Sequence, residues 1–522
     1  MRRSRNSSKA FEGNPAMGQF FTPAPVGQFM WRAIQGFMDG EVGTNLKVID
    51  PAAGRGDILQ AVIEEGGVER WVYGIEIDPE LVRQQICRAI QNRFYTGDGL
   101  ADLFPGVSPG SFDVVVGNPP FGRLAEILPH KTSVEKIAQF GLWQAGRKIN
   151  QGGVGKVKKD GIAIELLFVE RALQLLKPGG LVALIMPEGF FANKRLQAAR
   201  DWVLERAELL GVVALPDAVF CRPGLRATTS IVFLRKIFRP KKKSATVLLV
   251  GAKRNRTGKS LGQSLALTLR SLHALHRGGK SSDGLRVPAP SLKGKRWDVK
   301  FWHGAVGMQK LSQRFSLAPL GEYIGHLTYG PIVTGRRPQH REGGIKIIRQ
   351  GDFTETGLQL DQVLCVCENS VYDPLRSRVC QGDLLLPRSG AGSLGKNRLA
   401  VYTEKDPANI GCFVDLIRLV EINAFYVWFF LKTQMGWQQI RAIMNGVGTP
   451  NINFSEIRAL LIPQIPIEEQ GHFQKRYIEE VWPLHCRRQE GNDICSEAEK
   501  RFRKIVMDLE YFLGFGARPS GR

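Results

Sequence analysis

The stretch that most constrains the fold of this chain is Asp113–Gly122, in which three valines are followed directly by a glycine, an asparagine and two prolines. Three consecutive valines are typical of a parallel strand that is buried on both faces. Pro119 and Pro120 cannot donate to a β-ladder, so the strand has to end there and a stiff loop has to begin. That loop presents the Asn118 amide and the Phe121 ring at the carboxyl end of a strand, where open α/β sheets bind ligands. We therefore expect an α/β domain with its functional site at this edge of the sheet.

This loop suits chemistry on a planar, weakly nucleophilic amine such as the N6 of adenine. The Asn118 side-chain oxygen and the backbone carbonyl of Pro119 can accept both N6 hydrogens and draw the nitrogen toward a reactive geometry. The Phe121 ring can stack on the base, which contributes roughly 1–3 kcal/mol. The motif alone also fits an ordinary strand-to-loop turn, so its weight depends on the segments upstream.

Three upstream segments place polar groups at the ends of further expected strands. Residues 47–57 lead from a short apolar strand into a turn where Gly54 and Gly56 permit close backbone approach to a ligand. Glu76 ends a second strand, where a carboxylate commonly holds ribose hydroxyls. Asp98 ends a third strand and can accept from an adenine amino group. Together they predict a nucleoside site, although the glycine spacing matches neither a dinucleotide nor a phosphate-loop fingerprint.

The composition indicates a polyanionic partner. The 522 residues carry a formal net charge of +23, and because neutralising phosphates releases counterions, nucleic acid is favoured over a membrane surface. We find no apolar run of about 18 residues to cross a bilayer and no secretory signal. The eight cysteines are scattered without a C-x-x-C pair, which argues against a metal site or a disulfide framework and predicts a cytoplasmic protein.

In this order, the segments GQFFTP, DPAAGRGD, GIEIDP, GDG and GNPPFG resemble the γ class of S-adenosylmethionine-dependent DNA amino-methyltransferases, especially type I modification subunits and the related type II enzymes. The resemblance covers roughly residues 15–285. It implies a Rossmann-like catalytic domain that transfers a methyl group to the N6 amine of an adenine flipped out of the duplex. Positioning and hydrogen bonding would supply the catalysis, without a covalent intermediate or a metal. The expected position of a Pro-Cys nucleophile is not filled, which argues against C5-cytosine chemistry.

The resemblance also assigns roles to single residues. Asn118, Pro119, Pro120 and Phe121 would form the catalytic loop, and Phe220 would be the second ring that stacks on the target base. The residues that would hold S-adenosylmethionine are Phe20, Thr22, Pro23, Asp50, Ala52, Gly54, Glu76, Ile77, Asp98, Gly99, Asn118 and Phe168.

Within that cofactor set the individual contacts differ. Phe20 would line the methionine end, Glu76 would bind the ribose, and Ile77 would pack on the cofactor adenine. Phe168 would cover that adenine as a lid, or it is a buried helix residue. From the residues alone, Thr22 suits the N-cap of a helix whose first turn contains Pro23.

The second half of the chain changes to short strands and turns that resemble the target-recognition domains of type I specificity subunits. We expect a basic tail at 1–14, a methyltransferase domain at 15–275, a linker at 276–295, an α+β target-recognition domain at 296–465 and C-terminal helices at 466–522. The cations expected to contact DNA are Arg336, Arg337, Arg388, Lys396 and Arg398. An apolar stripe at 502–513 would pack against the recognition domain or form a dimer contact, so a monomer and a homodimer both remain open. The basic stretch 123–161 is a loop over the base pocket or a solvated charge run.

Other functions remain open from the sequence. Ribosomal RNA and protein-glutamine methyltransferases use a similar Asn-Pro-Pro-aromatic loop, but neither is expected to carry residues 18–23 or a specificity-type domain. A DNA-recognition or assembly subunit without turnover is a further alternative, against which Asn118, Glu76 and Asp98 argue. We expect no nuclease in this chain. Any cleavage in a restriction-modification or phage-defence system would come from a partner subunit.

Overall fold

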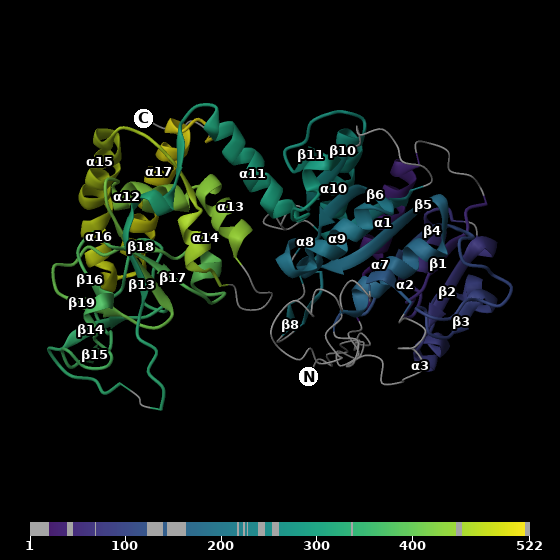
Figure 1. The fold of residues 1–522 in the computed structure, drawn as a ribbon, viewed down its shortest axis with the longest axis horizontal. Coiled ribbons are helices and arrows are strands. Elements are labelled where there is room, and N and C mark those ends of the chain that lie inside the picture. Colours follow the sequence, from purple (N-terminus) through teal and green to yellow (C-terminus); the bar gives the residue numbers. More distant parts are fainter. Residues whose placement is uncertain are drawn as a thin grey trace, which may run out of the picture. The chain divides into compact units, whose positions relative to one another are not determined.

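The computed structural model describes residues 20–38, 45–67, 69–122, 139–142, 163–216, 219–222, 225–226, 228–237, 246–252, 260–335, 338–444 and 451–516. The chain divides into two compact units, Met1–Trp302 and His303–Arg522 (Figure 1). The boundary between them falls inside helix α11 (Val299–Ser312).

A nine-stranded sheet in the order β11-β10-β6-β9-β5-β4-β1-β2-β3 forms the centre of the first unit. Its strands are β1 (Val48–Asp50), β2 (Val72–Glu76), β3 (Phe94–Thr96), β4 (Phe112–Gly117), β5 (Leu176–Pro187), β6 (Ala207–Ala214), β9 (Thr229–Lys236), β10 (Thr246–Gly251) and β11 (Gly284–Pro288). Strands β1 to β5 pair in parallel, whereas β9 is antiparallel to both β5 and β6. The strand order changes direction at β1, because β2 and β3 follow on one side of it and β4 and β5 lie on the other. Such switch points are where open sheets bind ligands. The expected α/β fold is confirmed.

Helices cover both faces of this sheet. One layer consists of α1 (Ala24–Phe37), α2 (Asp57–Glu64) and α10 (Leu261–His276), and the other of α7 (Ile164–Leu175), α8 (Glu188–Ala192) and α9 (Gln197–Leu204). The valines of β4 serve both layers, because Val114 and Val116 pack with the first layer and Val115 with the second. All three are fully buried, which explains why the run is apolar throughout.

The segment expected as an interdomain linker, residues 276–295, belongs to the first unit. Strand β11 lies within it and pairs antiparallel with β10 along its whole length. Leu285 and Val287 alternate along β11 and pack into the core of the second helical layer. Trp297 follows, fully buried, with its ring 5.8 Å from that of Phe190 and nearly perpendicular to it. The Gly, Ser, Pro and Lys content suggested a linker, but two alternating apolar residues are enough for an edge strand.

The second unit combines two four-stranded sheets with helices, which matches the expected α+β class (Figure 1). It begins after Trp302 rather than at residue 296. One sheet has the order β13-β20-β17-β18 and the other β15-β14-β19-β16, while β12 pairs with β21. The strands are β12 (Leu317–Pro319), β13 (Ile324–Tyr329), β14 (Ile345–Ile348), β15 (Cys365–Val366), β16 (Arg378–Val379), β17 (Leu384–Pro387), β18 (Ala400–Val401), β19 (Ala408–Ile410), β20 (Val414–Leu419) and β21 (Leu461–Pro463).

The α-helices of the second unit after α11, and one π-helical turn, lie in its C-terminal half. They are α12 (Ala424–Lys432), α13 (Gln434–Ile443), α14 (Phe454–Arg458), α15 (Ile467–Arg476), a π-helical turn (Tyr477–Val481), α16 (Trp482–Cys486) and α17 (Asn492–Phe512). The apolar stripe predicted on α17 is used inside this unit, since Phe502, Ile505 and Leu509 are buried in its core. The Phe502 ring lies 5.1 Å from that of Trp428. These side chains are therefore not available for a dimer contact.

Two features bear on the class of protein. Among the described residues, no helix is long and apolar enough to cross a bilayer. Within the same part of the chain, no three His, Cys, Asp or Glu side chains gather closely enough to hold a metal ion. The cysteines whose side chains are described are free thiols.

We expect Trp297→Ala to lower the free energy of unfolding of the first unit by about 3–5 kcal/mol, the range for removing a buried aromatic side chain. Hydrogen–deuterium exchange should rise in β5 and β9 and stay unchanged in β17 and β20. Trp71→Ala, which removes a half-buried indole from the same unit, is the matched control and should cost much less. Faster exchange confined to β17 and β20 would place Trp297 in the second unit instead.

Candidate functional site

The expected site residues of the first unit converge at one edge of the sheet. Asp50 ends β1, Glu76 ends β2, Asp98 follows β3 and Asn118 follows β4 directly. Because these four strands are parallel, their carboxyl ends meet. The β1 turn and β2 are joined by a 2.9 Å hydrogen bond from the Ala53 N–H to the carbonyl at the penultimate position of β2.

The amide of Asn118 is fixed by the segment that precedes α1. Its Nδ2 donates to the Phe20 carbonyl at 2.8 Å and to the Thr22 hydroxyl at 3.1 Å. Both amide hydrogens are thereby used, so the oxygen must point away from these partners. That oxygen, Oδ1, is buried and accepts no hydrogen bond from the described residues. A buried acceptor without a donor costs free energy, so this atom marks a place for a donor from a ligand.

The helix-capping role expected of Thr22 is wrong. Helix α1 begins at Ala24 with Pro23 at the N-cap position, and no side chain caps it. Pro25 stands at the second helical position and lacks one of the N–H groups that a cap would satisfy. The buried Thr22 hydroxyl accepts from Asn118 instead.

Three phenylalanine rings lie together near the catalytic loop. The Phe20 ring is 5.9 Å from the Phe121 ring at a tilt of 34°, and 6.2 Å from the Phe220 ring in an edge-on contact. Phe220 is buried and the other two are half-buried. The two rings expected to stack on a base are thus bridged by a third, which was expected only beside the cofactor.

Asp50 and Glu76 are buried acids at neighbouring strand ends. Asp50 accepts from the Ala52 N–H at 2.9 Å, and Glu76 accepts from the N–H groups of Gly54 at 2.8 Å and Asp78 at 3.0 Å. Burial raises the pKa of Asp50 to about 8, and burial also raises the pKa of Glu76. Such groups favour a ligand that brings positive charge or hydrogen-bond donors.

The loop after β3 brings Asp98 close to the end of β1. One carboxylate oxygen, Oδ1, accepts from a loop N–H at 3.0 Å, while Oδ2 is buried without a donor among the described residues. At Gly99 the loop approaches β1 so closely that a Cβ would lie 1.7 Å from the Pro51 carbonyl oxygen. Only glycine fits there. Arg171 of α7 holds the loop from the other side, because its Nε donates to the Gly99 carbonyl at 3.0 Å.

Sequence reasoning missed the charged residues of α7 that support the site. Arg171 holds the Asp98 loop, and Glu165 accepts from the Gly122 N–H at 3.2 Å, directly after the catalytic loop. The sequence signal was that these charges interrupt a mostly apolar run at 164–175. Eleven of the twelve residues of α7 are buried, and buried charges are rare unless paired. Phe168 is buried in the same helix, whereas Ile77 at the end of β2 is 41% exposed.

The expected DNA-contacting residues of the second unit differ in their surroundings. Arg336 and Arg337 lie outside the described residues, as does most of the basic stretch 123–161. Arg388 is half-buried against aromatic rings, and Lys396 is exposed. Arg398 donates to the Phe353 carbonyl at 3.3 Å.

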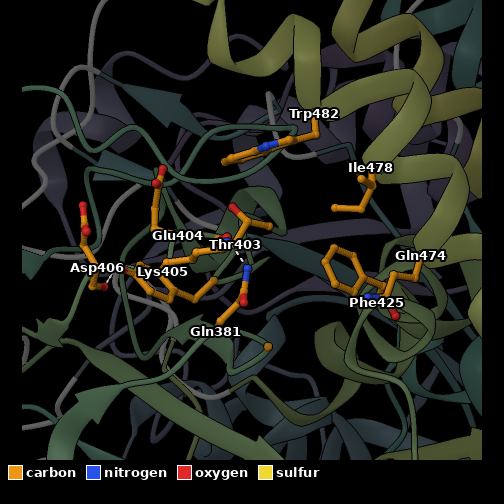
Figure 2. Close-up of a pocket in the computed structure, with 11 residues that line it drawn as sticks. Gln381, Thr403, Glu404, Lys405, Asp406, Phe425, Gln474, Ile478 and Trp482 are labelled. Atoms are coloured by element: carbon orange, nitrogen blue, oxygen red, sulfur yellow. Dashed lines mark hydrogen bonds between the residues drawn. The ribbon is translucent and has the colours of Figure 1, made fainter.

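A pocket of about 710 Å³ lies elsewhere in the second unit (Figure 2). Trp482 and Ile478 line it from the helical side, and the loop residues Glu404 and Asp406 line it from the side opposite. It contains none of the residues expected to bind the cofactor, the target base or DNA. The site at the β1–β4 strand ends is therefore a separate feature of the molecule.

A family model described as N-6 DNA Methylase matches residues 8–274, just over half of the chain. The type II methyltransferase M.TthHB8I of Thermus thermophilus is 26% identical over 233 residues, which are 45% of this chain and 44% of that protein. The "Defense against restriction protein B" of Escherichia phage P1 is 24% identical over 221 residues, which are 42% of this chain and 8% of that protein. The chain thus spans less than half the length of these relatives.

Solved structures with a related fold include restriction-modification proteins. The type IIG restriction endonuclease BpuSI aligns with a TM-score of 0.48 at 13% identity and covers 96% of this chain and 66% of that one. A type I methyltransferase subunit from Streptococcus thermophilus aligns with a TM-score of 0.39 at 16% identity and covers 52% of this chain and 56% of that one.

We expect Gly99→Ala to destabilise the first unit by about 1–3 kcal/mol, as overpacking does in a close-packed interior, because the new methyl group meets the Pro51 carbonyl. Chemical denaturation of the full chain measures the change. Gly189→Ala is the matched control, since a Cβ at that position meets nothing within 4 Å, and it should change stability by less than about 0.5 kcal/mol. Equal effects of the two substitutions would contradict the close approach of the two loops.

Proposed function

Because the chain belongs to the N-6 DNA methylase family, we propose that it is a site-specific DNA methyltransferase that moves a methyl group from S-adenosylmethionine to the N6 amine of an adenine. The observation that carries the proposal is the buried Asn118 oxygen without a donor. It lies on the loop that also carries Phe121, at the edge where three acidic strand ends meet. An adenine N6 amine has two hydrogens that need acceptors, and it complements this oxygen.

The acidic strand ends fit S-adenosylmethionine, which supplies an electrophilic methyl group when it is bound. The unpartnered Asp98 Oδ2 would accept from its adenine amino group. Each Glu76 oxygen accepts one backbone N–H and keeps a lone pair for a ribose hydroxyl. Ile77 offers exposed apolar surface for the adenine face. The positive charge of the cofactor would favour the ionised form of Asp50, whose pKa burial raises to about 8.

The chain's own contribution to transfer is the orientation of the amine. The Asn118 oxygen and the Pro119 carbonyl would accept the two N6 hydrogens and hold the nitrogen lone pair toward the methyl group. The nitrogen gains positive charge as the new bond forms, so both acceptors bind it more strongly in the transition state than in the ground state. The hydrogen bonds of Asn118 to Phe20 and Thr22 hold its amide in the orientation that this requires.

The target adenine would have to leave the duplex, at a cost of a few kcal/mol. Stacking on Phe121 and Phe220 would offset it by roughly 1–3 kcal/mol per ring. Since Phe20 contacts both rings, an entering base displaces the Phe20 ring or adds to its stack. The half-buried state of Phe20 and Phe121 leaves part of each ring accessible for this exchange.

We assign reading of the DNA site to the second unit, because the base pocket can tell adenine from other bases but not one site from another. The charge of +23 fits duplex DNA as the partner. A nuclease or another subunit of a restriction-modification or defence system is a further proposed partner.

Expressed alone in a host without adenine methylation of its own, the chain should leave N6-methyladenine at one sequence motif, detected by sequencing that reports modified bases. Asn118→Ala should abolish the mark because the amine loses its acceptor. Asn45→Ala, which removes an exposed amide from the same unit, should leave the mark intact. Near-normal turnover in Asn118→Ala would refute the assigned mechanism.

Glu76→Ala should weaken S-adenosylmethionine binding by about 1.5–3 kcal/mol, the contribution of hydrogen bonds to a charged group. Glu80→Ala, which removes a nearby exposed carboxylate, should leave the dissociation constant unchanged. A dissociation constant in Glu76→Ala equal to that of the unmodified protein would place the ribose elsewhere.

A further inference from the structure

Among the described residues of the second unit, three buried aspartates pair with an arginine. Two of these pairs are closed, meaning that the arginine donates a hydrogen bond to each carboxylate oxygen. Arg418 donates from Nε and Nη2 to the two oxygens of Asp383, at 2.8 and 2.7 Å. Arg378 does the same to Asp373, at 3.1 and 2.5 Å. Both carboxylates also accept from a backbone N–H. In these pairs the charges are matched and hydrogen-bonded, so they need no further partner.

The third pair, Arg388 and Asp415, is open. The Arg388 Nε lies 3.4 Å from the Asp415 Oδ1, and neither carboxylate oxygen accepts a hydrogen bond from the described residues. Asp415 is nevertheless fully buried, in the central strand β20. Burial of an acid without hydrogen bonds is costly, and it raises the pKa of Asp415 to about 7. A fold that keeps such a group gives up stability, which is typical of functional positions.

Two aromatic rings hold the Arg388 side chain in place. Its Cζ lies 4.3 Å from the centre of the Tyr329 ring and 5.6 Å from that of the Phe454 ring. Tyr329 is itself fixed, because it pairs with Asp415 across the β13–β20 ladder and its carbonyl accepts from Arg376 at 2.8 Å. A guanidinium packed against rings keeps its plane, so little side-chain freedom remains to be lost on binding.

The free edge of this guanidinium is a fork of donors. Nε is the guanidinium nitrogen closest to Asp415, and neither Nη1 nor Nη2 donates a hydrogen bond to any described residue. The Arg388 side chain is 29% exposed. Two parallel N–H groups match the O6 and N7 acceptors of guanine in the major groove. The buried carboxylate behind Arg388 offsets part of its charge in its ionised form, which weakens attraction to a phosphate but leaves both donors in place.

We propose that Arg388 reads a guanine of the recognised DNA site through Nη1 and Nη2. Asp415 is the positioning residue behind the guanidinium, and the rings of Tyr329 and Phe454 set its plane. This inference rests on the proposed function in one respect, because it takes duplex DNA as the partner of the second unit.

The test selects binding sites from a pool of randomised DNA duplexes with the full-length chain, so it does not depend on turnover. We expect the selected motif to contain a guanine whose replacement by 7-deazaguanine, which lacks N7, weakens binding. Arg388→Gln should lose preference at that position alone and become insensitive to 7-deazaguanine there. The loss of affinity at this guanine should lie between about fivefold and 150-fold, the range that corresponds to one bidentate arginine–base contact.

Two further variants separate positioning from structure. Asp415→Asn keeps the shape of the side chain and removes its charge, so it should reduce the 7-deazaguanine effect at the same guanine. Arg418→Gln opens a closed pair three residues from Asp415 and should leave that effect unchanged. If Asp415→Asn weakens binding to all duplexes equally, Asp415 has only a structural role and this part of the proposal fails.

The remaining outcomes are decisive. A motif without guanine, no motif at all, or 7-deazaguanine sensitivity that persists in Arg388→Gln would overturn the proposal. An equal loss on every duplex in Arg388→Gln, with a reduced dependence of binding on salt, would identify a phosphate contact and also overturn it. If the selected motif contains the guanine while the chain deposits no methyl groups, the proposed enzymatic function fails and the assignment of Arg388 stands.

Discussion

Two hydrogen bonds from one amide group set the geometry on which the first unit's site depends. Asn118 uses both amide hydrogens on the segment before α1, so its oxygen has a single direction. This ties a segment near the start of the chain to a loop about one hundred residues later, and the sheet supplies the frame for both. The parallel order of β1, β2, β3 and β4 brings the acidic strand ends to the same edge. A rotated amide would present donors instead of an acceptor, and the edge would then suit a different ligand.

Unsatisfied buried acceptors occur in both units, and some of them lie beside groups that hold them in place. They include the Asn118 oxygen and one oxygen of Asp98 in the first unit, and both oxygens of Asp415 in the second. Each costs free energy in the isolated chain. The surrounding fold pins them with bonds that are satisfied, such as the Arg171 contact to the Asp98 loop. Rigidity around an unpaired group is what allows it to discriminate between ligands.

The sequence was sufficient to predict the first fold and the convergence of the site, because both depend on local patterns. The valine run of β4 and the acids at 50, 76 and 98 follow strand periodicity and strand ends, which are local properties. The partners of Asn118 could not be predicted in the same way, since the capping preference of Thr22 is local but its contact lies across the fold. Arg171 and the open pair of Arg388 with Asp415 likewise depend on which strands become neighbours. Strand β11 was not predicted, because the Gly, Ser, Pro and Lys content of residues 276–295 indicated a linker. The alternating Leu285 and Val287 were the only sign of a strand there.

The position of Trp297 has a consequence for how such chains exchange their parts during evolution. Its indole completes the core of the first unit, and β11 before it supplies the edge strand of that unit's sheet. A genetic crossover between residues 276 and 283 would therefore join a sheet from one parent to an edge strand from another. A crossover after Trp302 transfers the second unit whole, because each unit then keeps its own core. Diversity of the second unit is thus inherited most readily through junctions within α11, where the protein sequence itself gives no sign of a break.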